Sequence, residues 1–111
     1  MPAHEHVNGV QFSYGKLDRG GKPLHQVVAR RDNRVVGTMN WSAKEVKVVD
    51  VHHSAQRQGI ATGMWNEGQR LAAEHGRIPA PKHSPDRTDA GDAWAKSVGG
   101  RLPRRSSWNA D

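Results

Sequence analysis

Apolar and polar residues alternate through the first part of the chain, which is typical of strands with one buried face. The first such stretch covers residues 10–14, and two longer ones cover residues 24–31 and 34–41. Asp32 and Asn33 stand between the longer stretches and tolerate the positive φ angles of a tight turn, so these two strands are expected to form an antiparallel hairpin. The second of them places its apolar residues on one face: Val35, Gly37, Met39 and Trp41.

A third long strand is expected over residues 45–51, which are rich in β-branched side chains. Its apolar phase slips, because Val46 and Val48 share one face whereas Val49 and Val51 share the other. Either both faces of this strand are buried, or one extra residue bulges the strand near its middle.

Helical periodicity replaces alternation over residues 59–75, and Gly76 stands at the C′ position that ends such a helix. The expected inward residues are Ile60, Met64, Trp65, Leu71 and Ala72, and the expected outward ones are Glu67, Gln69, Arg70 and Glu74. Residues 88–98 predict a second helix. Its expected inward residues are Ala90, Ala93, Trp94 and Val98.

Glycine and proline mark the breaks between these elements. The Gly-Gly pair at 20–21 and Pro23 are expected to interrupt the chain before the hairpin, and the proline-containing residues 78–81 can form only a weak edge strand. The order predicts a single α+β domain over residues 1–111. Its sheet is mixed and mostly antiparallel, with a bulged strand before the first helix and a parallel crossover after it. Residues 101–111 are basic and are expected to be a loose tail.

Composition narrows the classes of partner and of chemistry. The 111 residues include 17 Lys and Arg against 11 Asp and Glu, a formal net charge of +6, which favours an anionic partner such as nucleic acid, an acidic protein or a polyphosphate cofactor. The lack of cysteine excludes disulfide scaffolds, thiolate nucleophiles and zinc knuckles. No apolar run approaches the ~18 residues of a membrane span, and no signal peptide is recognisable, so a cytoplasmic protein without membrane contact is expected.

The segment between the third strand and the first helix is the main candidate for chemistry. A strand that passes through a glycine-containing turn into a helix leaves backbone N–H groups unpaired at the positive end of the helix dipole, and such an end binds phosphate. Gly59 and Ala61 would let a ligand approach the backbone closely, and Arg57 adds a positive charge. The alternative is a purely structural turn that opens the helix.

The motif Gln56-x-x-Gly59-x-Ala61, after a valine-rich strand and at the start of a helix, resembles the signature Gln/Arg-x-x-Gly-x-Gly/Ala of the GNAT superfamily of N-acetyltransferases. The resemblance covers residues 24–75 and, more loosely, 84–100. It implies transfer of an acetyl group from acetyl coenzyme A (acetyl-CoA) to a primary amine. In this family the loop's backbone amides hold the cofactor's pyrophosphate, which here implicates Gln56, Arg57, Gln58, Gly59, Ile60, Ala61 and Thr62. The resemblance also assigns the backbone of two strand residues to the pantetheine arm, Val49 and Val51.

Glu45 lies eleven residues before Gln56, the spacing at which some lysine-acetylating members of the family carry a glutamate that deprotonates the amine. A base is needed because an ammonium has no lone pair for attack on the thioester. Glu45 is the first candidate and Asp50 the second, and the alternative for Glu45 is a solvated charge at a strand end. The acceptor stays open: protein lysine, N-terminal amine, polyamine and aminoglycoside all fit.

The chain departs from the family's pattern at two places. Ala95 stands where the family commonly has a tyrosine that protonates the leaving thiolate, and Tyr14, the only tyrosine, belongs to another strand. The two helices that typical members insert after the first strand have no counterpart, so the acceptor site is expected to be open or to be completed by another chain, as in a homodimer. The alternative function is an inactive GNAT-fold module that binds protein or, less favoured, nucleic acid through a basic surface. That surface would include Arg30, Arg31, Arg34, Arg101, Arg104 and Arg105.

The loop before the second helix packs several reactive residue types together. His83 or Ser84 could replace the missing acid, whereas the favoured interpretation is a capping loop in which Asp86 or Thr88 begins the helix.

The tryptophans and the paired histidines have simpler interpretations. Trp65 and Trp94 fall on the apolar stripes of their helices and are expected in the core. His52 and His53 would point to opposite faces of a strand, so no metal site is predicted there.

Overall fold

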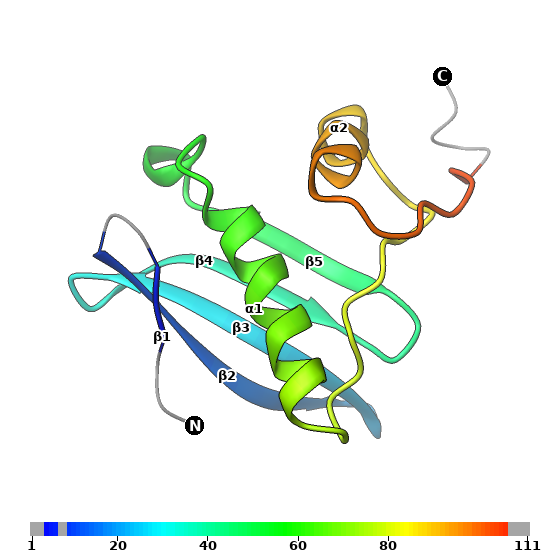
Figure 1. Ribbon diagram of the computed structural model, residues 1–111, viewed down its shortest axis with the longest axis horizontal. Coiled ribbons are helices and arrows are strands. Elements are labelled where there is room, and N and C mark those ends of the chain that lie inside the picture. The colour runs from blue at the N-terminus through cyan, green and yellow to red at the C-terminus, as the bar shows by residue number, and fades with distance from the viewer. Residues whose placement is uncertain (1–3, 7–8, 107–111) are drawn as a thin grey trace.

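The computed structural model describes residues 4–6 and 9–106 and folds them into an antiparallel sheet with two α-helices (Figure 1). The strands, which lie in sequence order across the sheet, are β1 (His4–His6), β2 (Val10–Arg19), β3 (Lys22–Arg31), β4 (Arg34–Trp41) and β5 (Val46–Val51). The helices are η2 (His53–Ala55), a short 3-10 helix, α1 (Ile60–Glu74) and α2 (Asp89–Val98). The α+β class is confirmed. No helix among the described residues has both the length and the apolar character needed to cross a bilayer.

All strand pairings within the described residues are antiparallel, so the expected mixed sheet with a parallel crossover is wrong. In the described part of the chain, residues 78–81 form no strand. Pro79 and Pro81 have no backbone N–H to donate to a ladder, which explains the irregular path. The segment still reaches the sheet, because the N–H of Val46 donates to the carbonyl of Lys82 at 2.7 Å.

Two-residue turns close both long hairpins. Gly20 and Gly21 have φ angles of 61° and 78° and join β2 to β3, so the expected interruption at these glycines is a tight turn, whereas the expected break at Pro23 is wrong because Pro23 lies within β3. Asp32 and Asn33 have φ angles of 51° and 63° and form the turn predicted between β3 and β4. Positive φ at both central residues gives a turn whose twist matches the right-handed twist of the two flanking strands. The first hairpin leaves no residues for helices between the first long strand and the next.

A bulge in β4 changes which of its residues face the core. Ala29 pairs with Gly37 whereas Arg30 pairs with Val35, which leaves Val36 as the extra residue. Val35 is therefore 50% exposed, and the expectation that it shares one face with the other apolar residues of the strand is wrong. The other residues assigned to that face are buried: Gly37, Met39 and Trp41.

The slip in the apolar phase of β5 is caused by a second bulge. Asn40 pairs with Val48 whereas Trp41 pairs with Val46, so Lys47 is the extra residue. The bulge is confirmed, although it lies at the start of the strand rather than in its middle. Burial of both faces is wrong, because Val48 is 45% exposed and its neighbour on the other face, Val49, 37%.

α1 lies across one face of the sheet and supplies much of the core (Figure 1). Its predicted inward residues Ile60, Met64, Trp65 and Leu71 are buried, and Ala72 is half-buried. Glu67 is also buried, at 8% exposure, against the expectation that it faces solvent. Its carboxylate accepts two hydrogen bonds from Arg70, at 2.9 and 2.8 Å, which offset its desolvation. Gly76 follows the C-cap residue, as predicted.

α2 begins where the sequence predicts and is rotated from the predicted orientation. The hydroxyl of Thr88 caps it by accepting a hydrogen bond of 3.1 Å from a backbone N–H in the first turn, as expected for one of the two proposed caps. Ala90 and Ala93 are exposed, so their expected inward position is wrong, and Asp92 and Ala95 are buried instead. The rotation follows from an ion pair of 3.0 Å that draws Asp92 toward the preceding loop.

Residues 101–106 return to the loop before α2 and are held there. The N–H of Ser106 donates to the carbonyl of Pro85 at 2.9 Å, and Arg105 Nη2 donates to the carbonyl of Arg87 at 2.8 Å. The expectation of a loose tail is therefore wrong for these residues, and residues 107–111 lie outside the described part of the chain.

Candidate functional site

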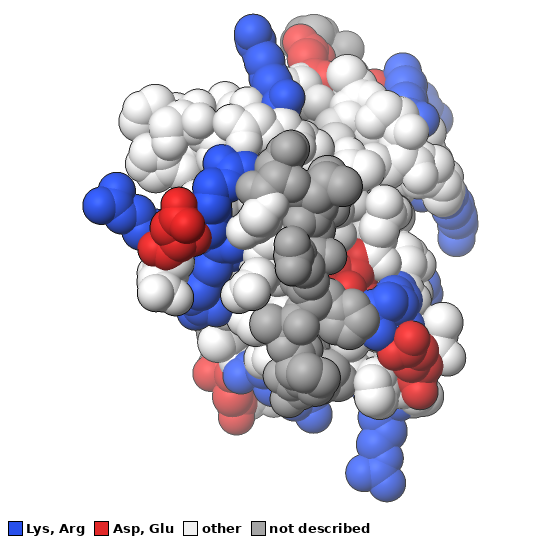
Figure 2. Space-filling model, turned by 60° about the vertical axis from the view of Figure 1, so that its left-hand side comes forward, with Lys and Arg blue, Asp and Glu red and all other residues white. Residues whose placement is uncertain are grey.

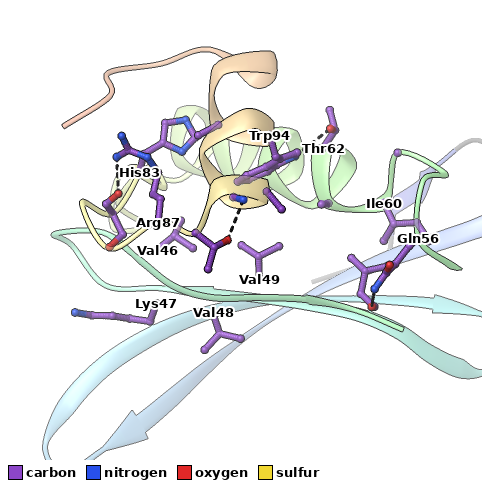
Figure 3. Close-up of a pocket in the computed structure, with 18 of the residues that line it drawn as sticks. Val46, Lys47, Val48, Val49, Gln56, Ile60, Thr62, His83, Arg87 and Trp94 are labelled. Atoms are coloured by element: carbon purple, nitrogen blue, oxygen red, sulfur yellow. Dashed lines mark hydrogen bonds between the residues drawn. The ribbon is translucent and has the colours of Figure 1, made fainter. Parts of the chain in front are cut away.

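A cavity of about 960 Å³ opens between the edge of β5, the start of α1 and the first turns of α2 (Figure 3). Its walls come from three stretches that are distant in sequence, within residues 46–62, 83–88 and 90–95. The volume lies in the range of small-molecule and cofactor sites. The element order therefore brings the motif-bearing turn, the bulged strand and the last helix to one place.

The N-terminus of α1 forms one end of this cavity. Gly59 is its N-cap residue, with a φ of 78°, and no side chain caps the helix. The N–H of Gly63 donates to the carbonyl of Gly59 at 2.8 Å, so the N–H groups of Ile60, Ala61 and Thr62 precede the first intrahelical bond. The first turn contains no acidic residue. The positive end of the helix dipole is thus left for an anion from outside the chain.

The residues of the predicted pyrophosphate loop lie mostly, but not all, at the cavity. Gln56 turns back to β5, where its Nε2 donates to the carbonyl of Val51 at 3.2 Å. Arg57 has a positive φ of 64° and lines the cavity with an exposed side chain. Gln58 does not line it, because its Oε1 accepts a hydrogen bond of 2.7 Å from Arg31 Nη2. The predicted residues that do line it are Val49, Val51, Gln56, Arg57, Gly59, Ile60, Ala61 and Thr62.

β5 presents an open edge along the cavity. The N–H of His52 donates to the carbonyl of Val36 on β4 at 2.8 Å, so backbone alternation turns the peptide groups of Val49 and Val51 toward the opposite edge. Figure 3 shows the side chain of Val49 directed toward α2 and that of Val48 directed away. An extended ligand could therefore lie along this edge and hydrogen-bond to it.

Aromatic side chains connect α2 to α1 above the strand. The rings of Trp65 and His83 stack in parallel, with centroids 4.1 Å apart, and Trp94 meets Trp65 edge-on at 5.7 Å. The indole N–H of Trp94 donates to Thr62 Oγ1 at 3.2 Å. Trp65 belongs to the core, as predicted, whereas Trp94 is half-buried and forms part of the cavity wall.

Arg87 organises the loop before α2, a role that motif reasoning missed. Its Nε donates to Asp92 Oδ1 at 3.0 Å and its Nη1 to the carbonyl of Ser84 at 2.7 Å, with only 9% of the residue exposed. Lys96 also pairs with Asp92, at 3.0 Å. These cations, Lys96 first and Arg87 second, lower the pKa of the Asp92 carboxyl below its ordinary value. The available sequence signal was the spacing of Arg87 and Asp92, which lie five residues apart on either side of the predicted cap.

The two proposed bases lie away from the predicted pyrophosphate loop. Glu45 is half-buried just before β5, and its Oε1 forms an ion pair with Lys47 Nζ at 3.0 Å. It does not line the large cavity but a neighbouring one of about 460 Å³. Asp50 is exposed opposite Thr38 and lines neither cavity.

Arg30 and Arg105, two of the arginines outside the cavity, have local partners. Arg30 Nη1 donates to Ser13 Oγ at 2.8 Å, and Arg105 Nη1 lies 3.2 Å from Asp89 Oδ1. Figure 2 shows, for the face in view, Lys and Arg side chains distributed among Asp and Glu rather than gathered in one patch. Among the described residues of that face, the positive charge therefore forms no continuous basic track.

The paired histidines have a different geometry from the one expected. His52 and His53 lie where β5 passes into η2, and their rings stack with centroids 4.5 Å apart instead of pointing to opposite faces. His52 Nδ1 contacts Ser54 Oγ at 2.8 Å. Within residues 4–6 and 9–106, no three His, Cys, Asp or Glu side chains come together as a potential metal site.

A second polar cluster lies in the core, outside both cavities. The hydroxyl of Tyr14 and Nδ1 of His25 are 2.5 Å apart, and the His25 ring lies 5.7 Å from that of Trp41. Burial raises the pKa of Tyr14. Burial, together with the nearby Lys16, lowers the pKa of His25. The phenol of the only tyrosine is thus engaged with a buried imidazole.

Comparisons of the chain with protein-family models, with curated proteins and with solved structures found no match.

Proposed function

We propose that this chain is an acetyl-CoA-dependent N-acetyltransferase that moves an acetyl group to a primary amine, as its resemblance to the GNAT superfamily implies. One observation carries the proposal: the uncapped N-terminus of α1 and the open edge of β5 line the same cavity. A pyrophosphate joined to an extended amide-containing arm is the ligand that suits such a combination of an anion site and a strand edge.

In this proposal the cofactor's pyrophosphate binds the N–H groups of Ile60, Ala61 and Thr62, with Arg57 adding charge beside them. Anions at a helix N-terminus gain from both the free donors and the dipole. Gln58 is left out, because its amide is engaged by Arg31.

The pantetheine arm runs along β5 from Val51 toward Val46, about 16 Å at the rise of a strand. The carbonyl of Val51 already accepts a hydrogen bond from Gln56, so the peptide group available to the arm is that of Val49. A backbone N–H of the bulged strand, other than that of Val46, which donates to the carbonyl of Lys82, polarises the thioester carbonyl where negative charge develops. The thioester then lies near Val46 and His83, at the far end of the cavity from the N-terminus of α1 (Figure 3).

Proton removal falls to Glu45, which directly precedes Val46 in the chain. The acceptor ammonium gives one proton to this carboxylate, and the neutral amine attacks the carbonyl carbon. As the C–N bond forms, the C–S bond breaks, and the second proton of the nitrogen passes to the departing thiolate. The products are an amide and free CoA.

Binding of acetyl-CoA is the direct test, measured by isothermal titration. Ala61→Glu places a carboxylate in the anion site while adding an acidic residue that a helix N-terminus tolerates well. It should weaken binding by more than tenfold and leave folding intact. The matched control is Ala73→Glu, at an exposed position near the other end of the helix, which should bind as the wild type does. A wild-type chain that binds no acyl-CoA would end the proposal.

The alternative is a binding module that keeps this fold without transfer chemistry. It is favoured by Ala95, whose fully buried methyl group stands where the family's acid would be. A chain that binds acetyl-CoA but releases no thiol with a panel of primary amines would support it. A nucleic-acid version requires affinity that falls steeply with salt, because phosphate contacts release counterions.

A further inference from the structure

A second cavity, of about 460 Å³, lies beside the first and shares one residue with it. That residue is His83, which Figure 3 shows in the lining of the large cavity. The stacked rings of Trp65 and His83 form one wall of the smaller cavity, and Pro81, Pro85 and Pro103 contribute to the others. A small, mostly apolar hollow with rigid walls has the character of a small-molecule site.

His83, the residue at which the two cavities meet, is held in place by its contacts. His83 is 5% exposed, stacks on Trp65 with an angle of 5° between the rings, and contacts the carbonyl of Gly99 with Nε2 at 2.7 Å. A carbonyl can only accept, so Nε2 carries the proton of this bond, and in the neutral ring Nδ1 keeps a lone pair. A ligand in the smaller cavity would therefore meet a fixed aromatic surface.

The charges around the smaller cavity are uneven. Lys44, Lys82 and Arg101 line it with exposed side chains, and none of the three side chains has a hydrogen-bonding or ion-pairing partner within the described residues. Glu45 is the acidic residue of the lining, is half-buried and pairs with Lys47 at 3.0 Å, so a bound ammonium would share this carboxylate with Lys47. Three free cations around one hollow repel one another and attract an anion, whereas a single carboxylate attracts a cation.

We propose that the smaller cavity binds the amine acceptor, and that this acceptor is a small primary amine carrying an anionic group, a carboxylate or a phosphate. The ammonium meets Glu45, and the anionic group meets Lys44, Lys82 and Arg101. This inference rests on the proposed function and deepens it. The acceptor then lies beside His83, the residue at which the two cavities meet, and next to the thioester of the large cavity.

The placement gives Glu45 a role that its distance from the pyrophosphate loop otherwise leaves unexplained. It accepts one proton from the bound ammonium, the freed lone pair forms the C–N bond, and the C–S electrons leave with the thiolate, which takes the second proton. No oxidant, metal or further reactant is required. A polyamine or a lysine side chain lacks the anionic group and would meet three uncompensated cations.

The test uses the full chain and pairs of probes that differ in one group. Phosphoethanolamine and β-alanine carry the anionic group as phosphate and as carboxylate, and 1,4-diaminobutane carries a second ammonium instead. Each is titrated into ¹⁵N-labelled protein. The anionic amines should shift the indole signal of Trp65 and the amide signal of Gly100, which both line the cavity, and the diamine should not. Whichever anionic probe binds more tightly identifies the group.

Two variants test the charges separately. Arg101→Glu should weaken the anionic amines about tenfold, since it replaces an attraction by a repulsion, whereas Arg104→Glu, an exposed arginine outside the cavity, should leave them unchanged. Glu45→Gln should abolish the preference for phosphoethanolamine over inorganic phosphate. Equal binding of diamine and anionic amines, or equal effects of the two arginine variants, would overturn the proposal.

Acetyl-CoA is titrated separately, so the two proposals fail separately. If acetyl-CoA binds and the anionic amines leave the signals of the smaller cavity unmoved, the acceptor proposal is overturned and the proposed function stands. If acetyl-CoA does not bind, the proposed function fails and the acceptor role fails with it, whatever the amines do.

Discussion

Trp94 on α2 donates its indole N–H to Thr62 Oγ1 in the first turn of α1, at 3.2 Å (Figure 3). The same ring meets Trp65 edge-on, so one side chain ties the last helix to the core and to the candidate anion site. Thr62 is the third residue of α1, and its backbone N–H is one of the free donors of that site. The closure of the cavity by α2 and the geometry of the anion site are therefore linked through this pair.

Loss of the hydroxyl acceptor should loosen this link. Thr62→Val keeps the shape of the side chain but leaves the half-buried Trp94 N–H without its partner, which should cost about 1 kcal/mol in the free energy of unfolding. Thr62→Ser keeps an oxygen at the same position and is the matched control. Urea unfolding compares the two variants, and equal midpoints would show that the hydrogen bond contributes nothing to stability.

The ion pairs of Asp92 predict a dependence of stability on pH. Lys96 and Arg87 lower the pKa of this carboxyl below its ordinary value of 3.8, so the folded state holds its proton less tightly than the unfolded state does. The resulting stability is present above that value and is lost as the pH falls through the lowered pKa.

Unfolding midpoints in urea, measured from about pH 6 down to about pH 3, should fall more steeply for the wild type than for Asp92→Asn. The matched control is Asp89→Asn in the same helical turn, whose side chain is 85% exposed, and it should retain the wild-type slope. A slope unchanged by Asp92→Asn would contradict the role of these pairs.

The fold could be predicted where local chemistry decides the conformation. Asp32 and Asn33 tolerate positive φ, so their turn was recoverable from sequence. The slipping valines of β5 allowed either a bulge or burial of both faces, and pairing with β4 decides for the bulge. The turn at Gly20 and Gly21 was not recoverable, because two glycines suit a loop as well as a type I′ turn. The bulge at Val36 has no local signal, since it is set by pairing with β3.

The site was predictable only in its local part. The turn around Gly59 can be recognised from residues adjacent in sequence, and it does lie at a cavity. The inward position of Asp92 depends on its ion pair with Arg87, and the burial of Glu67 depends on its ion pair with Arg70. In both cases the ion pair offsets the cost of burying the carboxylate. Glu45 was placed by counting from Gln56, and spacing along a chain does not determine which cavity a side chain lines.

The buried His25 predicts a second effect of pH on stability, in which the charged form of the group is a cation rather than an anion. Burial and the nearby Lys16 lower the pKa of its imidazole below the ordinary value of 6.5, so the unfolded state binds the proton more readily. Stability is complete above about pH 6.5 and decreases as the pH falls toward the lowered pKa. Replacing His25 by Gln should reduce the loss of stability between about pH 7.5 and pH 5.5. His75→Gln, at an exposed position, should not change it, and the same slope in both variants would contradict the assignment.

Gly68 on α1 lies against Pro81, in the segment that carries His83. A Cβ added at this glycine would lie 2.5 Å from Cγ of Pro81 and 3.3 Å from Cε of Met39. The proline ring cannot rotate away, so Gly68→Ala should push the segment outward and destabilise the fold by about 1–3 kcal/mol, despite the better helix propensity of alanine. Gly76→Ala is the matched control, because nothing lies within 4 Å of its added Cβ.

The same substitution tests whether this packing positions His83, the residue that lines both cavities. Pro81 lies two residues before His83, so displacement of the segment should move the imidazole off the Trp65 ring and change the indole signal of Trp65 in a ¹⁵N spectrum. Urea unfolding and this spectrum should change together in Gly68→Ala, and neither should change in the control. A variant as stable as the wild type, with an unmoved Trp65 signal, would show that the segment yields at little cost and that His83 is held by its own contacts alone.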